Sequence, residues 1–220
     1  FTMKDGYSFH LDQACLNSTY QEMYGCYENI LSRMHLRYRA VEADTGNIGG
    51  AESHEFHVLA ENGEDLIAYA TEGEYAANID KAMSANPADP ATPSEQVAQV
   101  KTPGIKSIDQ VCEFLDLEPQ TVLKTILVQG KEEKIVALVL RGDHELNEVK
   151  VSKILDVRLP LKFASDLEII QSIGCEPGSI GPVDLPILYF VDRDAAALSD
   201  FTCGANKEGF HLTGVNWQRD

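Results

Sequence analysis

Residues 176–183, EPGSIGPV, form the stretch whose composition best suits contact with the polar atoms of a ligand. Gly178 and Gly181 can adopt positive φ at little cost, while Pro177 and Pro182 fix φ and lack an N–H group. We therefore expect a stiff loop that a ligand can approach closely and that presents its few amides in a set direction. A tight connection between a helix and a strand is the structural alternative.

Three isolated side chains stand where a site built on a sheet could use them. Lys124 interrupts the apolar strand TVLKTILV, Asp192 ends the strand ILYFVD, and His211 lies in the apolar run FHLTGV. Functional groups often collect where strands end and loops begin. A solvent-exposed lysine and a purely structural histidine are the alternatives.

Other patterns give weaker support for chemistry. His54 and His57 are three residues apart in an apparent strand, which places them on opposite faces and disfavours a shared metal ion. The segment GNIGG does not match the dinucleotide-binding motif, and the GxSxG motif of serine hydrolases does not occur. Cys175 and Cys203 have no base nearby in sequence, so we expect neither a covalent mechanism nor a metal ion.

Composition limits the partners of the chain. The 220 residues carry a net charge of −17, which argues against wrapping of nucleic acid and leaves only local contact with an RNA end or loop. No run of about 18 apolar residues occurs, so we expect no membrane span. The first ten residues lack an apolar segment, which predicts that there is no signal peptide. The five cysteines are scattered and odd in number, which is typical of reduced thiols and predicts a cytoplasmic location.

The remaining patterns predict the elements that position these residues. Apolar spacing predicts helices over 13–36, 107–115, 145–156, 165–173 and 193–200, with Ser107 and Ser165 as N-caps. Strands are expected at 38–43, 54–60, 65–70, 121–129, 134–141, 186–192 (buried) and 210–217, and two hairpins are expected, 54–60 with 65–70 and 121–129 with 134–141. Residues 81–104 are rich in Ala and Pro and read as a linker. The mixture predicts an α/β (α+β) fold.

Several longer segments resemble those of bacterial-type prolyl-tRNA synthetases, which are class II aminoacyl-tRNA synthetases. FTMKDGYSFH resembles the second strand of class II motif 2, and ADTGNIGGAESHEFHVLAENGED, EYAANIDKA and HLTGVNWQRD resemble parts of the catalytic domain. The editing domain inserted in that family is matched by TPGIKSIDQV, TVLKTILV, RGDHELNEVK, PGSIGPV, VDRDAAALSDF and CGANKEGFH. The resemblance runs essentially from end to end.

This resemblance implies a division of the chain and roles for single residues. Residues 1–80 would be a partial class II catalytic domain with an antiparallel sheet, 81–101 a linker, 102–212 an editing domain with a mixed central sheet and surrounding helices, and 213–220 a return into the catalytic domain. Phe1 and Asp5 would be remnants of the synthetic site. Lys124, Asp192 and His211 would act in editing, with His211 as a wall that selects the amino acid. The loop formed by Gly178, Ser179, Ile180, Gly181 and Pro182 would hold the aminoacyl-adenosine.

The implied function is hydrolysis of alanyl-tRNA(Pro), the product of charging tRNA(Pro) with alanine instead of proline. Editing would need no cofactor, whereas the parent synthetase, expected to be a homodimer, would use ATP and Mg²⁺ to charge tRNA(Pro) with proline. Because not all segments for that step are matched, this chain is not expected to activate proline. A module that binds the tRNA 3′ end or a partner protein without chemistry is the alternative, and a metal-dependent hydrolase is a third possibility.

Overall fold

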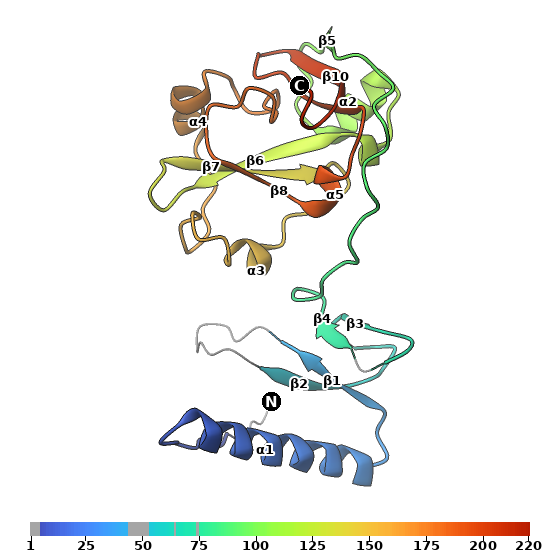
Figure 1. Cartoon of the computed structure of the whole chain (residues 1–220), viewed down its shortest axis with the longest axis vertical. Helices are drawn as coiled ribbons and strands as arrows, with labels where there is room; N and C mark the ends of the chain where they lie inside the picture. The colour runs from blue at the N-terminus through green and yellow to red at the C-terminus, as the bar shows by residue number, and fades with distance from the viewer. Residues whose placement is uncertain (1–4, 44–52, 64, 74) are drawn as a thin grey trace. The chain divides into compact units, whose positions relative to one another are not determined.

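The computed structural model describes residues 5–43, 53–63, 65–73 and 75–220 (Figure 1). The chain divides into two compact units, an N-terminal unit, Phe1–Met83, and a C-terminal unit, Ser84–Asp220. Both combine helices with strands, which confirms the predicted α/β (α+β) class. No helix within the described ranges is long and apolar enough to cross a membrane.

The N-terminal unit contains one long helix and one sheet. The helix is α1 (Gln13–Arg33), and the strands are β1 (Tyr38–Glu42), β2 (His54–Val58), β3 (Ile67–Tyr69) and β4 (Ala76–Asn78), in the order β2-β1-β4-β3. β1 pairs antiparallel with β2 and parallel with β4, while β3 pairs antiparallel with β4. The hairpin predicted between 54–60 and 65–70 is therefore wrong. β2 pairs with β1 over five residue pairs, whereas the three-residue β3 could offer β2 at most three such pairs.

The two histidines of β2 have separate partners. Nδ1 of His54 lies 2.8 Å from the Tyr20 hydroxyl on α1, and Nε2 of His57 lies 2.8 Å from the Glu55 carboxylate. Tyr24 packs edge-on against Phe56, the residue between the two histidines on the strand, with ring centroids 4.9 Å apart. His54 thus takes part in the packing of α1 on the sheet, while His57 pairs with an acid.

The C-terminal unit contains two three-stranded sheets. The first has the order β5-β10-β9 and is antiparallel: β5 is Ala98–Lys101, β9 is Phe201–Gly204 and β10 is Phe210–Val215. The second has the order β6-β7-β8: β6 is Leu123–Gln129, β7 is Ile135–Arg141 and β8 is Tyr189–Val191. The predicted β6–β7 hairpin is confirmed, and β8 joins β7 in parallel. A bridge between Val122 and Thr202 links the sheets.

Short helices connect these strands: α2 (Ile108–Leu115), the 3₁₀ turn η2 (Pro119–Thr121), α3 (Glu148–Val151), α4 (Asp166–Ile173) and α5 (Arg193–Ala196). Ser107 and Ser165 cap α2 and α4 as predicted, each in a capping box. The helix predicted over 145–156 is a single turn, because its apolar residues reach the core from successive turns instead of one helix face. β8 is not buried as predicted, since it lies at the edge of its sheet and leaves Tyr189 39% exposed.

The core lies on both faces of β7, whose residues from Ile135 to Leu140 are all buried. On β6, which is next to it, side chains alternate between the faces. Leu127 joins a cluster with Ile169 and Ile180, while Val128 joins a different cluster with Val151. Successive side chains of β6 therefore point to opposite faces of the sheet, and each contacts only residues on its own face.

The structure moves two predicted boundaries. Residues 98–101 lie in the predicted linker but form β5, paired with β10 from Phe210 to Thr213. Residues 213–220 were expected to return to another domain, yet Val215 is 1% exposed in the same core cluster as Phe201. Both segments belong to the C-terminal unit. β5 is hydrogen-bonded to β10, and Val215 at the end of β10 packs in the core of this unit.

A polar network ties the two ends of the C-terminal unit together. The carboxylate of Asp200 accepts hydrogen bonds from the amide and hydroxyl of Ser94, from the amide of Glu95 and from the side chain of Asn216. The hydrogen bonds from Ser94, followed by those from Asn216, hold the pKa of Asp200 well below its usual range. Arg219 adds bonds to the carbonyls of Glu95 and Gly214. Segments more than 100 residues apart in sequence therefore lie side by side.

Replacement of Asn216 should destabilise the C-terminal unit. Asn216 is 3% exposed, and its amide group exchanges two hydrogen bonds with Asp200. Asn216→Ala leaves the Asp200 amide without its acceptor and removes one donor from the Asp200 carboxylate, so the free energy of unfolding should fall by about 2 kcal/mol. The single tryptophan, Trp217, lies in this unit, so urea unfolding followed by its fluorescence measures the change. Thr213→Ala, which removes only a 3.5 Å bond, is the control, and an equal loss in both variants would contradict the expectation.

Candidate active site

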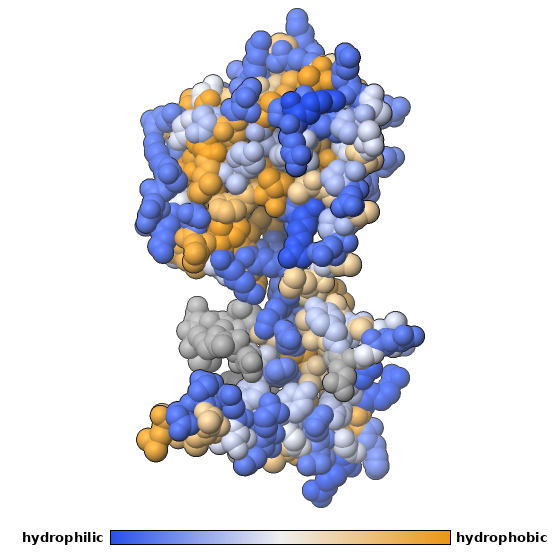
Figure 2. Space-filling model, viewed as in Figure 1, coloured by the Kyte–Doolittle hydropathy of each residue, from blue (hydrophilic) through white to orange (hydrophobic). Residues whose placement is uncertain are grey.

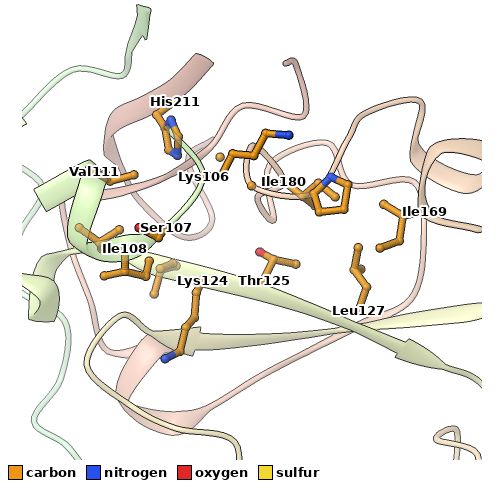
Figure 3. Close-up of a pocket in the computed structure, with 15 residues that line it drawn as sticks. Lys106, Ser107, Ile108, Val111, Lys124, Thr125, Leu127, Ile169, Ile180 and His211 are labelled. Carbon is orange, nitrogen blue, oxygen red and sulfur yellow. The ribbon is translucent and has the colours of Figure 1, made fainter. Parts of the chain in front are cut away.

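A cavity of about 310 Å³ opens in the C-terminal unit at the start of α2 (Figure 3). Its floor is β6, and its walls come from α2, α4, β9, β10 and the loop at 177–180. The lining residues are Lys106, Ser107, Ile108, Val111, Val122, Leu123, Lys124, Thr125, Leu127, Ile169, Pro177, Gly178, Ile180, Gly204 and His211. No carboxylate occurs among these described lining residues. The cavity is mostly apolar, with a few polar groups from segments distant in sequence.

Contact between two backbone segments fixes the loop beside this cavity. A Cβ on Gly204 of β9 would lie 2.4 Å from the carbonyl carbons of Ser179 and Ile180, and a Cβ on Gly181 would lie 2.0 Å from the Gly204 carbonyl oxygen. Any side chain at either position would force these segments apart. Gly178 has φ +103°, in the left-handed region that favours glycine. The glycines of GSIGP are therefore needed for the shape predicted from the sequence.

Asn206 holds the far side of the loop. Its Oδ1 accepts the amide of Gly181 at 2.9 Å, its Nδ2 donates to the carbonyl of Val183 at 2.7 Å, and its own amide donates to the carbonyl of Ser179 at 2.8 Å. The hydroxyl of buried Ser179 accepts the amide of Gly209. These bonds pin the loop to the turn between β9 and β10.

The loop amides divide into two groups. The amide of Gly181 is already bonded to Asn206, so it does not face the cavity as the sequence suggested. Within the described part of the chain, the amides of Gly178, Ser179 and Ile180 donate no hydrogen bond. Gly178 and Ile180 line the cavity, whereas Ser179, Gly181 and Pro182 do not. The free amides of Gly178 and Ile180, whose residues line the cavity, thus remain as donors for a ligand.

His211 lines the cavity from β10 and is 4% exposed. Its Nδ1 lies 2.6 Å from the hydroxyl of Thr102, which is itself fully buried. Burial lowers the pKa of His211 below its ordinary value of 6.5, so the ring is neutral at pH 7. In Figure 3 the ring lies across the cavity from Leu127 and Ile169. This position suits a wall that limits the size of a bound group.

Lys124 occupies a less direct position than the sequence suggested. It is one of the lining residues, but its ammonium donates to the carbonyl of Gly142 at 3.1 Å. Figure 3 shows the side chain pointing away from His211, while Thr125 points toward the cavity. The alternation along β6 causes this separation. The ammonium of Lys124 is therefore directed toward Gly142 and away from His211.

Asp192 lies in a second cavity, of about 480 Å³, which does not include His211 or the loop. Its carboxylate caps α5 through the amide of Asp194, and Nδ1 of His144 lies 3.7 Å from its Oδ1. Leu138, Val151 and Phe190 give this cavity apolar walls, and Figure 2 shows apolar side chains on the face that carries β8 and α3. Asp192 is thus not brought together with His211.

Of the two predicted remnants of a synthetic site, Asp5 is exposed in the N-terminal unit, and Phe1 lies outside the described residues.

Sequence reasoning missed four residues of this region. Lys106 and Thr125 line the cavity, Thr102 supports His211, and Asn206 supports the loop. The Oγ1 atom of Thr125 is buried and, among the described residues, has no hydrogen-bond partner. Asn206 offered one signal, because asparagine tolerates the positive φ of +51° that its turn requires. The others are common residue types with no distinguishing spacing.

Comparison with known proteins identifies the class of this domain. The model of the aminoacyl-tRNA editing domain family matches residues 102–220. The chain belongs to this family. The match covers the cavity, the loop at 178–182 and all three of Lys124, Asp192 and His211.

Solved structures similar to the chain include three with a TM-score of 0.46. One is a protein described only as hypothetical, 21% identical, which covers 53% of this chain and 79% of its own. Another is described as a candidate trans-editing enzyme for prolyl-tRNA synthetase, 16% identical, with coverages of 53% and 74%. The third is a scaffold used for computational grafting of epitopes, 15% identical.

Removal of the Asn206 side chain should loosen the loop. Asn206→Gly accommodates the positive φ and removes both side-chain bonds, so exchange of the Gly181 amide with solvent should quicken by about tenfold. Hydrogen exchange of the peptide that contains 177–183, followed by mass spectrometry, measures this. Asn206→Asp keeps an acceptor for Gly181 and should exchange at close to the original rate. Unchanged exchange in Asn206→Gly would show that the Asn206 side chain is not needed to hold the loop.

The buried ring of His211 predicts a dependence of stability on pH. Because its pKa is lowered in the folded state, the unfolded state binds a proton first as the pH falls through 6.5. The free energy of unfolding should therefore be highest above 6.5 and should decrease below it, down to the folded pKa. Urea unfolding at about pH 7.5 and about pH 5.5 tests this. His211→Gln should lose less stability between these pH values than the original protein, and an equal loss would refute the assignment to His211.

Proposed function

We propose that the cavity hydrolyses the ester bond of alanyl-tRNA(Pro), and that the chain is part of a bacterial-type prolyl-tRNA synthetase. The family supports editing of aminoacyl-tRNA in general. The prolyl specificity rests on the end-to-end resemblance of segments such as EYAANIDKA and HLTGVNWQRD. The observation that carries the proposal is that Gly178 and Ile180, whose amides are unbonded, line an apolar cavity walled by His211.

Ester hydrolysis requires stabilisation of the oxygen that becomes negative when water attacks the carbonyl. Preorganised backbone amides do this well, and each such donor is worth roughly 2.7–4 kcal/mol in an enzyme that depends on it. The amides of Gly178 and Ile180 are the donors for this role. They are held in place by the Gly181–Gly204 contact and by Asn206.

The substrate itself activates the attacking water. The described lining residues include no carboxylate, and His211 shares its Nδ1 with Thr102. The free hydroxyl of the terminal ribose lies next to the ester in any aminoacyl-tRNA and can orient a water molecule there. No metal ion or organic cofactor enters this mechanism.

Selectivity follows from size. A synthetic pocket for proline rejects the smaller alanine weakly, since each missing methylene changes binding by only about 1–3 kcal/mol. A second pocket that accepts alanine and excludes proline corrects the errors. Val111, Ile180 and the neutral ring of His211 are the side chains that restrict the space.

Lys124 and Asp192 retain predicted roles that rest on the family resemblance. An ordinary lysine is protonated at pH 7, so Lys124 would supply charge to the tRNA end and would not act as a base. To reach a bound substrate, its ammonium must leave the Gly142 carbonyl, 3.1 Å away. Asp192 would act indirectly, through the turn that contains His144. The parent enzyme would use ATP and Mg²⁺ to charge tRNA(Pro) with proline, as a cytoplasmic homodimer.

Deacylation assays test this proposal. The protein should release alanine from alanyl-tRNA(Pro) and leave prolyl-tRNA(Pro) intact, as measured with radiolabelled amino acids. His211→Ala enlarges the pocket and should allow slow release of proline. Lys124→Ala should reduce release of alanine, and unchanged release would remove Lys124 from the mechanism.

Two results would favour the alternatives. Binding of alanyl-tRNA(Pro) without any release of alanine would favour a module that only binds the tRNA end. Loss of activity in the presence of a chelator would favour a metal-dependent hydrolase, for which His144, Asp192 and Asp194 offer ligand atoms within 4.8 Å of one another.

A further inference from the structure

An ion pair spans the edge of the cavity. Nζ of Lys106, just before α2, lies 3.0 Å from Oε2 of Glu176, just before the loop. Both side chains are about half exposed, at 56% and 48%. Figure 3 shows the lysine extending between His211 and Ile180. The pair joins the segment before α2 to the segment before the loop.

Lys106 is the cationic side chain best placed to meet the substrate. The cavity lining contains two lysines, Lys106 and Lys124, and the ammonium of Lys124 is turned toward Gly142. The stem of Lys106 packs on the loop, since a Cβ on Gly178 would lie 2.7 Å from its Cβ. The base of the Lys106 side chain is therefore held against Gly178, one of the two cavity-lining residues with a free amide.

We infer that Lys106 binds the 5′-phosphate of the terminal adenosine and exchanges the Glu176 carboxylate for it. The inference rests on the proposed function, because the ester on the loop amides places that phosphate one ribose away. A lysine ammonium is a compact charge that commonly binds phosphate. An exposed ion pair contributes little to stability, so exchange of one anion for another is readily reversible.

Glu176 has a defined part in this exchange. It holds the Lys106 ammonium beside the cavity when no phosphate is there, and it must move aside when one arrives. It also repels the phosphate until it moves. In a chain with a net charge of −17, a single held cation at the mouth gives the incoming tRNA end a local point of attraction.

Binding of two matched probes tests this inference without requiring hydrolysis. The probes are 3′-alanylamido-3′-deoxyadenosine, which cannot be hydrolysed, with and without a 5′-phosphate. Dissociation constants are measured by calorimetry on the full chain. Lys106→Met removes the charge but keeps the stem that packs on Gly178. It should weaken binding of the phosphorylated probe by about tenfold and leave the other probe within about twofold.

Two further variants complete the design. Lys106→Arg should restore most of the preference for the phosphorylated probe. Glu176→Gln should strengthen binding of that probe by about two- to fivefold, since the competing carboxylate is gone.

Equal weakening of both probes in Lys106→Met would mean that the residue acts only through the loop, and this overturns the inference. No weakening of either probe overturns it as well. A phosphate preference that depends on Lys106, in a protein that releases no alanine from alanyl-tRNA(Pro), would support this inference while refuting the proposed function.

Discussion

The architecture of the cavity depends on one close approach between backbones, that of the loop at 178–182 and β9. Gly204 and Gly181 meet with no room for a Cβ on either residue. The two main-chain segments are therefore in direct contact, with no side chain between them. Beside this contact, the Gly181 amide donates to Asn206, while Gly178 and Ile180 line the cavity with free amides. The position of the donors, the shape of the wall and the path of the next turn all follow from this approach.

The alternation of side chains along β6 imposes the second constraint. It sends Thr125 toward the cavity and the ammonium of Lys124 toward Gly142. Asp192 occupies a cavity of its own at the end of β8. Resemblance to a family predicts roles for Lys124 and Asp192, but the sequence of a seven-residue strand does not indicate which of its faces belongs to the site. The loop and His211 form one group, and Asp192 with His144 forms another.

The sequence predicted elements where local chemistry decides the structure. Ser107 and Ser165 begin helices because a serine hydroxyl accepts the third amide, and the apolar β6–β7 pair folds back at a polar turn. It failed where distant segments decide. β5 has only four residues and depends on β10, more than 100 residues away. Lys106 and Thr102 could not be predicted, because only the fold brings them to the loop and to His211, and the signal from Asn206 indicated a turn and not a contact with the loop.

The network around Asp200 has a consequence for the architecture of larger proteins. Because β5 pairs with β10 and Asp200 bonds to both Ser94 and Asn216, the first and last segments of the C-terminal unit lie side by side. A unit whose two ends meet in this way can be joined to another domain at a single place with little strain on either. Local opening of one of two domains joined so narrowly then need not unfold the other.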